Sequence, residues 1–269
     1  MIVKRHGPGS SRFVTCPLLF LFRRAASVRT EKGENLTSFE TTAERIRPDN
    51  VLGRLPAELA GKLLAGERTI TLREGETLFE RGDAGDGCYW LRRGVLTVSV
   101  TSANGEQRIL AVLGPGELVG EIAMIDGLPR SATVQAVRPC ELAFVSRAAF
   151  TEIMNRHPEL HRDIVMTLAA RLRQSDEDMV ASSFLTVRAR VARALLAFAR
   201  HLGEEVEPGR VRIRHKVTQS DLAAMAGVAR ESVSRTLGGW TRQKIIEGSS
   251  RGGYVVHETR LKREASAAD

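Results

Sequence analysis

The sequence has few cysteines and no long apolar run. Its three cysteines, Cys16, Cys88 and Cys140, are far apart and form no CxxC pair. This spacing excludes a disulfide framework and a four-cysteine iron–sulfur cluster, and it favours a reducing, cytoplasmic setting. The best apolar candidate, CPLLFLF at 16–22, is much shorter than the roughly 18 residues of a membrane-spanning helix, so no membrane partner is expected.

Signatures of enzymes and metal sites are also missing. No nucleophile elbow, P-loop or HExxH motif occurs, so we expect no catalytic residues and no enzyme activity. His157 and His161 have the i, i+4 spacing of a zinc-binding pair, but no third ligand is near them in sequence. Two exposed histidines are the simpler interpretation, and we expect no metal or redox cofactor.

No acidic residue precedes Glu31 in the sequence. A targeting peptide would need a small-residue cleavage site after the apolar stretch at 16–22, and no such pattern follows it. We expect residues 1–48 to be a disordered extension, or to lie upstream of the true translation start.

Positive charge is concentrated near the C-terminus. Residues 208–263 hold 12 Lys and Arg against 4 Asp and Glu, a net charge of +8, whereas residues 51–207 carry a net charge of −2. The C-terminal segment is therefore a candidate polyanion-binding module.

Two kinds of periodicity divide the rest of the chain. Between about 68 and 147, short β-branched and aromatic runs alternate with glycine-containing turns, which predicts an antiparallel sandwich or barrel. From 147 onward the pattern predicts a short helix and then a long one, with Pro158 near the start of the second. Spacings of three and four along the long helix indicate a dimer seam, or a helix packed on its own domain. The seam residues are Ile164, Leu168, Leu172, Ser175, Met179 and Ser182.

Residues 186–257 have the pattern of a winged helix-turn-helix. An amphipathic helix ends at Gly203, and RVRIRHK is a candidate strand. Thr218 is a suitable N-cap for the helix QSDLAAMA, and Gly227 stands where a tight turn is needed. ARESVSRTLGGW is the expected second helix, and SSRGGYVVH is the expected wing hairpin.

The stretch GEIAMIDGLPRSATV at 120–134 places two opposite charges in an apolar run. Glu121 and Arg130 can form an internal salt bridge, although such buried pairs stabilise weakly. Alternatively, both can bind one ligand. Arg130 would then hold a phosphate with help from Ser131 and backbone N–H groups, while Glu121 accepts from a sugar hydroxyl.

These motifs resemble two modules of one protein family. GEIAMIDGLPRSATV resembles the phosphate-binding cassette of cyclic-nucleotide-binding domains. VTQSDLAAMAGVARESVSR resembles the helix-turn-helix of the CRP/FNR family of bacterial transcription regulators. The resemblance covers about residues 50–260 and implies a homodimer that binds a cyclic nucleotide and double-stranded DNA, with RNA polymerase as a further partner.

The resemblance also assigns roles to the cassette. Glu121 would bind the ribose 2′-hydroxyl, and Arg130 and Ser131 the cyclic phosphate. The implied nucleotide-binding residues are Gly120, Glu121, Ile122, Arg130, Ser131 and Ser175.

The choice of base stays open at this point. Ser175 matches a purine-contacting threonine of the family, but Asp176 replaces the serine that follows it there. In related kinase regulatory domains a threonine directly after the arginine accompanies cGMP. Ser131 is compatible with either nucleotide, and cAMP is favoured.

The second helix of the helix-turn-helix carries side chains suited to base contacts. Arg230, Glu231, Ser234 and Arg235 share one side of it, where arginine can pair with guanine and glutamate can accept from cytosine. A solvated face with two arginines is the alternative. In the family RE-x-x-x-R accompanies a TGTGA-like half-site, which implies a TGTGA and TCACA palindrome. The expected phosphate contacts are Thr218, Ser220 and Ser232.

We therefore predict an α+β protein that acts as a cyclic-nucleotide-controlled transcription regulator. Two alternatives remain: a regulator of the same fold that is ligand-independent or senses another effector, and a nucleotide-sensing regulatory subunit of a partner enzyme. The predicted segments are the extension at 1–48, a jelly-roll-like antiparallel β-roll at 49–155, a dimerisation helix at 156–184, the winged helix-turn-helix at 185–260 and a tail at 261–269.

Overall fold

The computed structural model describes residues 68–248 and 253–267. Cys16 and the predicted extension at 1–48 lie outside the described residues. Within the described ranges, no helix combines the length and the hydropathy needed to cross a bilayer.

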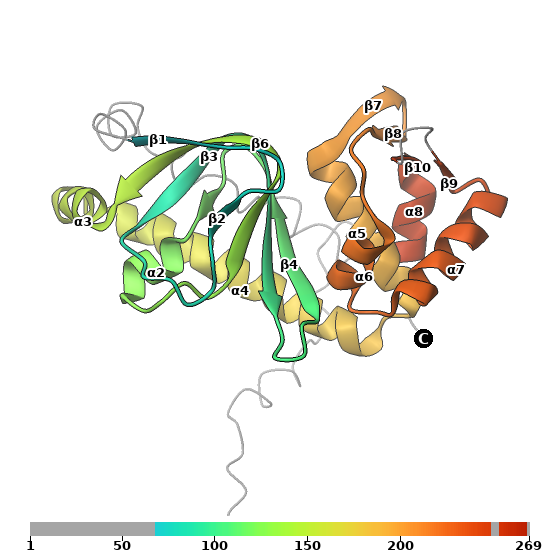
Figure 1. Ribbon diagram of the computed structural model, residues 1–269, viewed down its shortest axis with the longest axis horizontal. Helices are drawn as coiled ribbons and strands as arrows, with labels where there is room; N and C mark the ends of the chain where they lie inside the picture. The colour runs from blue at the N-terminus through green and yellow to red at the C-terminus, as the bar shows by residue number, and fades with distance from the viewer. Residues whose placement is uncertain (1–67, 249–252, 268–269) are drawn as a thin grey trace, which may run out of the picture. The chain divides into compact units, whose positions relative to one another are not determined.

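The first described part is an antiparallel β-roll (Figure 1). Its main strand order is β1-β6-β3-β4, with β2 paired to β6 and β5 paired to β3. The antiparallel architecture predicted from the short strand patterns is confirmed. The strands are β1 (Arg68–Leu72), β2 (Thr77–Phe79), β3 (Gly87–Thr101), β4 (Gln107–Leu113), β5 (Leu118–Val119) and β6 (Thr133–Ser146).

Two of these strands each join two short β-branched and aromatic runs. CYWLRRG and LTVSVT lie in the single strand β3, and TVQAV and ELAFVS lie in the single strand β6. The register between β3 and β6 shifts near Gly94, which has a φ of 98°. A bulge there lets the paired strands bend and continue, so the glycine does not end the strand. The core between the strands includes Leu91, Leu96 and Leu142.

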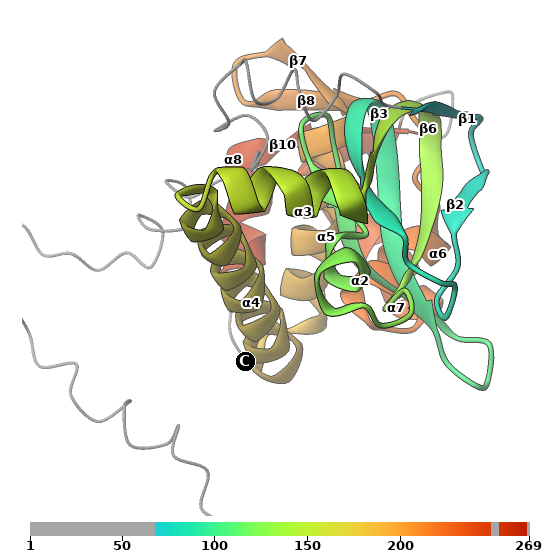
Figure 2. The same ribbon diagram turned by 90° about the vertical axis from the view of Figure 1, so that its left-hand side faces the viewer.

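Three helices adjoin the roll (Figure 2). They are α2 (Glu121–Asp126), α3 (Arg147–Arg156) and α4 (Leu160–Phe184). Ser146 caps α3 by accepting from the backbone N–H of Ala149 at 3.2 Å. Figure 2 shows α3 crossing near the start of α4, where Met154 and Leu160 belong to one apolar cluster with Met124 of α2. Pro158 lies two residues before α4, as the pattern predicted.

The interpretation of the seam as a helix packed on its own domain describes the start of α4, and the dimer seam stays a prediction. Ile164 is partly buried against the cluster that includes Met124 and Val145 of the roll, as expected for a helix packed on its own domain. Leu172 and Met179 are 64% and 68% exposed, and further large apolar side chains are exposed beside them. The exposed apolar residues of α4 are Val165, Met166, Leu172, Met179, Val180 and Phe184.

The second described part contains the predicted helix-turn-helix (Figure 1). Thr186 caps α5, which ends before Gly203 as predicted. The strands form a sheet in the order β7-β8-β10-β9, and β9 and β10 pair as an antiparallel hairpin. The stretch SSRGGYVVH, predicted as the wing, contributes β10, and its residues 249–252 lie outside the described residues. The elements are α5 (Val187–Leu202), β7 (Gly203–Glu207), β8 (Arg210–Ile213), α6 (Gln219–Ala226), α7 (Arg230–Arg242), β9 (Ile246–Gly248), β10 (Tyr254–His257) and α8 (Glu258–Ala265).

The predicted boundary between the winged helix-turn-helix and a tail at residue 261 is wrong. Residues 261–265 belong to α8, and the side chain of Leu261 is fully buried. The Glu264 carboxylate accepts from Nε and Nη2 of Arg188, at 2.9 and 2.7 Å, and from Nε1 of Trp240 at 3.0 Å. One buried leucine in a strongly charged stretch gives a weak sequence signal, which explains the error.

Candidate functional site

The cassette begins with a backbone that only glycine adopts readily. Gly120 precedes α2 with a φ of 83°, in the left-handed region. A methyl group placed on its Cα would lie 2.5 Å from Nη1 of Arg130. The Gly120 backbone therefore comes close to the arginine.

Arg130 is a desolvated cation held at several points. The residue is 3% exposed, and Nη1 donates to the carbonyls of Gly87 and Gly120 at 2.7 and 2.8 Å. Its guanidinium carbon lies 4.4 Å from the ring centre of Phe79. The charged partner is Asp86, whose Oδ1 is 3.7 Å from Nη2 and whose side chain is 79% exposed. Because the counter-charge is solvated, this pair is weak, and an anion can compete for the cation.

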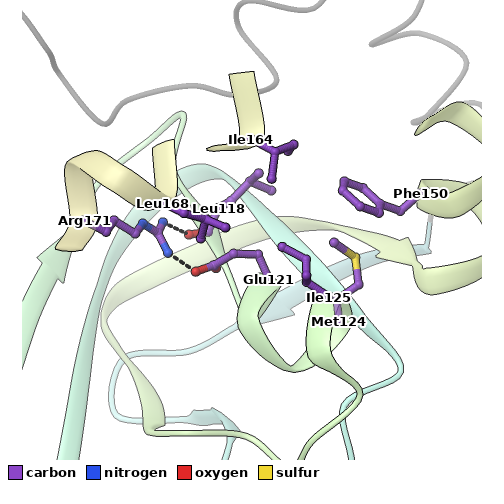
Figure 3. Close-up of a pocket in the computed structure, with 8 residues that line it drawn as sticks. All are labelled: Leu118, Glu121, Met124, Ile125, Phe150, Ile164, Leu168 and Arg171. Carbon is purple, nitrogen blue, oxygen red and sulfur yellow. Dashed lines mark hydrogen bonds and ion pairs between the residues drawn. The ribbon is translucent and has the colours of Figure 1, made fainter. Parts of the chain in front are cut away.

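Glu121 has a different partner, which excludes an internal Glu121–Arg130 bridge as the main pairing. Its carboxylate is ion-paired with Arg171 of α4 (Figure 3). Arg171 also donates from Nη2 to the carbonyl of Leu118 at 2.6 Å. Sequence reasoning missed Arg171, although it lies one helical turn before Ser175 on the same face of α4.

An apolar pocket adjoins this ion pair (Figure 3). It is formed by the end of β5 and by α2, α3 and α4, and its lining combines the two charged groups with aliphatic and aromatic side chains. A site with apolar walls and a few polar groups suits a small organic ligand. The apolar lining residues are Leu118, Met124, Ile125, Phe150, Ile164 and Leu168.

The remaining predicted ligand residues are solvent-accessible. Ile122 is 45% exposed, and Ser131 is exposed directly after the buried Arg130. Ser175 is also exposed, and its hydroxyl donates to the carbonyl of Arg171 at 3.1 Å. The hydroxyls of Ser131 and Ser175 are therefore accessible from solvent.

The cysteines and histidines show no comparable arrangement. Burial, with a smaller contribution from Glu121, raises the pKa of the Cys88 thiol from 9.0 to about 12. His157 interacts with Glu159 through Nδ1 at 3.0 Å, and His161 with the carbonyl of Pro158 at 2.9 Å. No group of three or more metal-ligating side chains occurs among residues 68–248 and 253–267.

The helix-turn-helix presents its predicted base-contacting residues to solvent. Arg230, Glu231, Ser234 and Arg235 are all exposed on α7, whereas Val233 and Trp240 are fully buried beneath them. Gly227 has a φ of 62° and ends α6, which confirms the predicted turn. Burial of the apolar side thus fixes which side chains of α7 face outward.

The three side chains predicted to contact phosphates differ in the hydrogen bonds that their hydroxyls already make. Thr218 forms a capping box: its hydroxyl accepts from the N–H of Asp221 at 3.1 Å and donates to the carboxylate of Asp221 at 2.7 Å. The N-cap prediction is therefore confirmed, and a DNA contact by Thr218 would compete with this hydrogen bond. Ser220 is exposed, and the Ser232 hydroxyl accepts from Arg235 at 3.3 Å.

Comparison with known proteins matches both parts of the chain. The model of the cyclic nucleotide-binding domain matches residues 69–157, and that of the Crp-like helix-turn-helix domain matches residues 189–264. The cyclic AMP receptor protein of Thermus thermophilus is 36% identical over 192 residues, or 71% of this chain and 84% of the relative. A CRP-like cAMP-activated global transcriptional regulator of Mycobacterium tuberculosis is 27% identical over 196 residues, or 73% and 87%.

Solved structures have the same fold. A transcriptional regulator of the CRP/FNR family from Thermus thermophilus matches with a TM-score of 0.64 at 25% identity, over 75% of this chain and 100% of that one. A c-di-GMP-responsive global regulator from Xanthomonas campestris matches with a TM-score of 0.65 at 21% identity, over 75% and 99%. These relatives are transcription regulators rather than enzymes. The chain therefore belongs to the CRP/FNR family of transcription regulators, with a cyclic nucleotide-binding domain followed by a Crp-like helix-turn-helix.

Proposed function

We propose that the protein is a homodimeric transcription regulator whose affinity for DNA is controlled by cAMP. One observation carries the ligand proposal: among the described residues, the buried Arg130 has only a solvent-exposed carboxylate as its counter-charge, while the buried Glu121 is held by an arginine of the long helix. The cyclic phosphate would replace Asp86 at Arg130. The ribose hydroxyl would compete with Arg171 for Glu121.

This competition gives a route from ligand to DNA. Arg171 belongs to α4, so a nucleotide at Glu121 changes a bond between the roll and the long helix. A ligand shifts a conformational equilibrium only by its difference in affinity between the two states. The favoured state would place two recognition helices about one DNA turn apart.

The dimer and its DNA site are supported by two exposed surfaces. Val165, Leu172 and Met179, each seven residues apart, leave an exposed apolar face on α4 that a second copy of the helix can cover. The exposed Arg230 and Arg235 can pair with guanines of TGTGA half-sites in a palindrome. RNA polymerase is the expected protein partner, and the cytoplasm the expected location.

Control by a different effector is the second candidate. Asp176 replaces a serine of the family pattern beside the predicted base contact at Ser175. The structural relative from Xanthomonas campestris is described as c-di-GMP-responsive. The regulatory-subunit alternative is disfavoured by the exposed base-contacting side chains of α7.

Fluorescence anisotropy on a labelled TGTGA-N6-TCACA duplex tests the proposal. The titration is made at fixed ionic strength, because phosphate contacts dominate affinity, and is repeated with cAMP and with cGMP. We expect cAMP to tighten binding about tenfold or more, or about 1.4 kcal/mol of coupling. The Arg130→Ala variant should lose this response and keep nonspecific DNA binding.

The contrary outcomes separate the parts of the proposal. Tight, specific DNA binding that ignores both nucleotides would contradict the ligand assignment and favour another effector. Absence of specific binding under every condition would contradict the half-site, and selection from random duplexes would then identify the true site.

A further inference from the structure

Arg147, the first residue of α3, joins two segments that belong to the nucleotide site. Its Nη2 donates to the carbonyl of Gly85, in the loop between β2 and β3, and to the carbonyl of Ala123 in α2, both at 2.8 Å. Its backbone N–H donates to the carbonyl of Asp86 at 2.9 Å. One residue therefore ties this loop to α2.

Arg130 makes a parallel pair of contacts. Its Nη1 donates to the carbonyl of Gly87, the first residue of β3 directly after this loop, and to the carbonyl of Gly120, which precedes α2. Together the two arginines bind the three consecutive carbonyls of residues 85–87, with the Asp86 carbonyl taken by the backbone of Arg147. The loop is thus held to α2 at two places, one by the predicted phosphate ligand and one by Arg147.

The contact at Arg147 is close and enclosed. A methyl group on Gly85 would lie 2.5 Å from Cβ of Ala123, so the loop and α2 pack directly on each other there. Nε of Arg147 is buried and has no hydrogen-bond partner among the described residues, so the guanidinium is desolvated on that side. Removing Arg147 would leave the Gly85 carbonyl without its donor and the Ala123 carbonyl with only the N–H of Gly127, at 3.1 Å. The loop would then lose its side-chain bond to α2 and would be free to shift relative to it.

We propose that Arg147 is a positioning residue for the nucleotide site, which rests on the proposed cyclic-nucleotide function. It fixes α2, which carries Glu121, to the loop that leads into Asp86 and Gly87, two of the partners of Arg130. The ribose-binding and phosphate-binding groups are therefore kept at the separation that one nucleotide requires. Arg147 itself does not touch the ligand.

The test compares two ligands on the full chain. Calorimetry gives the Kd of cAMP and of 2′-deoxy-cAMP, which lacks the hydroxyl assigned to Glu121. We expect Arg147→Met to weaken cAMP about tenfold or more. We also expect the ratio of the two Kd values to fall by about threefold or more, because the 2′-hydroxyl contact is already misplaced. Lower stability alone leaves this ratio unchanged below the unfolding transition.

Two further variants complete the design. Arg156→Met is the matched control, because Arg156 lies on the same helix, 70% exposed and paired only locally with Glu152, and it should behave as the wild type. Arg147→Lys keeps the charge, but its shorter side chain ends in an ammonium group instead of the planar guanidinium that places Nη2 between both carbonyls, so an intermediate loss is expected. This variant also serves if the methionine variant does not fold.

The outcomes distinguish the two proposals. A wild-type ratio in both Arg147 variants, with or without a uniform loss of affinity, would overturn the positioning role and leave the proposed function intact. A wild-type protein that binds neither cAMP nor cGMP would overturn both.

Discussion

Arg171 of the long helix is ion-paired with Glu121 of the cassette and donates to the carbonyl of Leu118 at 2.6 Å. Arg171 is therefore already paired with the carboxylate that is proposed to accept the ribose hydroxyl. A ligand that binds Glu121 must share or displace this contact. This pair connects the proposed nucleotide site directly with α4.

Replacing Arg171 by methionine should separate nucleotide binding from DNA binding. The apolar stem is kept, while the bonds to Glu121 and Leu118 are lost. We expect the tightening of DNA binding by cAMP to fall by about tenfold, or about 1.4 kcal/mol of coupling. Anisotropy titrations of DNA with and without cAMP measure this coupling. The control is Arg173→Met, because Arg173 is exposed on the same helix. Full coupling in Arg171→Met would refute this route.

Asp86→Asn should strengthen nucleotide binding. The Asp86 carboxylate lies 3.7 Å from Arg130 and would repel a cyclic phosphate bound at the same cation. Removing one charge at this range in a solvated setting contributes about 0.5 kcal/mol, or roughly two- to threefold in Kd. Calorimetry at two salt concentrations provides the check, because the gain should shrink as salt rises. Weaker binding in Asp86→Asn would mean that Asp86 orients Arg130 instead.

Arg235→Ala should relax sequence preference at one guanine. A bidentate arginine–guanine pair contributes about 1–3 kcal/mol of discrimination. The measurement is a competition series in which each half-site base is varied in turn. Arg242→Ala, in the last turn of the same helix, should weaken all sequences alike or not at all. An unchanged base preference in Arg235→Ala would contradict the placement of α7 in the groove.

Cys88 should be unreactive at neutral pH. Because burial raises the pKa of its thiol from 9.0 to about 12, the folded state holds the thiol proton more tightly than the unfolded state does. Its contribution to stability is then fully present below about pH 9 and is lost as pH rises toward 12. In a Cys16→Ser background, a thiol reagent at pH 8 should label the folded chain slowly and the denatured chain at once.

The pH-linked part of that prediction needs a comparison of two proteins. The free energy of unfolding should decline more steeply above pH 9 in the wild type than in Cys88→Ala. Tyrosine and lysine titrations occur in both proteins and cancel in the difference. Identical slopes, or fast labelling of Cys88 at pH 8, would refute the shifted pKa.

Glu264→Gln should destabilise the DNA-binding part. The carboxylate holds α8 to Arg188 of α5 and to Trp240 of α7, and an amide keeps only a neutral acceptor. We expect a loss of about 1–2 kcal/mol in the free energy of unfolding, measured by urea denaturation. Glu258→Gln, on the same helix in an exposed pair with Lys262, should change stability by less than about 0.5 kcal/mol. Equal effects would show that α8 contributes little through Glu264.

Local patterns were sufficient for several predictions. Thr218, Gly203 and Gly227 act as caps and turns through their own backbone and side-chain chemistry, so their roles follow from short stretches of sequence. Strand ends were harder to predict, because Gly94 marks a bulge within β3 rather than a turn. Whether a glycine interrupts a strand depends on the pairing of its neighbours, which the local sequence does not contain.

The antiparallel roll, the helix-turn-helix and the residue types of the cassette follow from the sequence alone, since these depend on periodicity, capping and motif spacing. The pairing of the charges follows only from the folded structure. Glu121 pairs with Arg171, 50 residues away, and Arg130 with Asp86 rather than with the glutamate nine residues before it. The roles of Arg147 and α8 have the same origin, because hydrogen bonds between distant segments depend on how the chain folds back on itself.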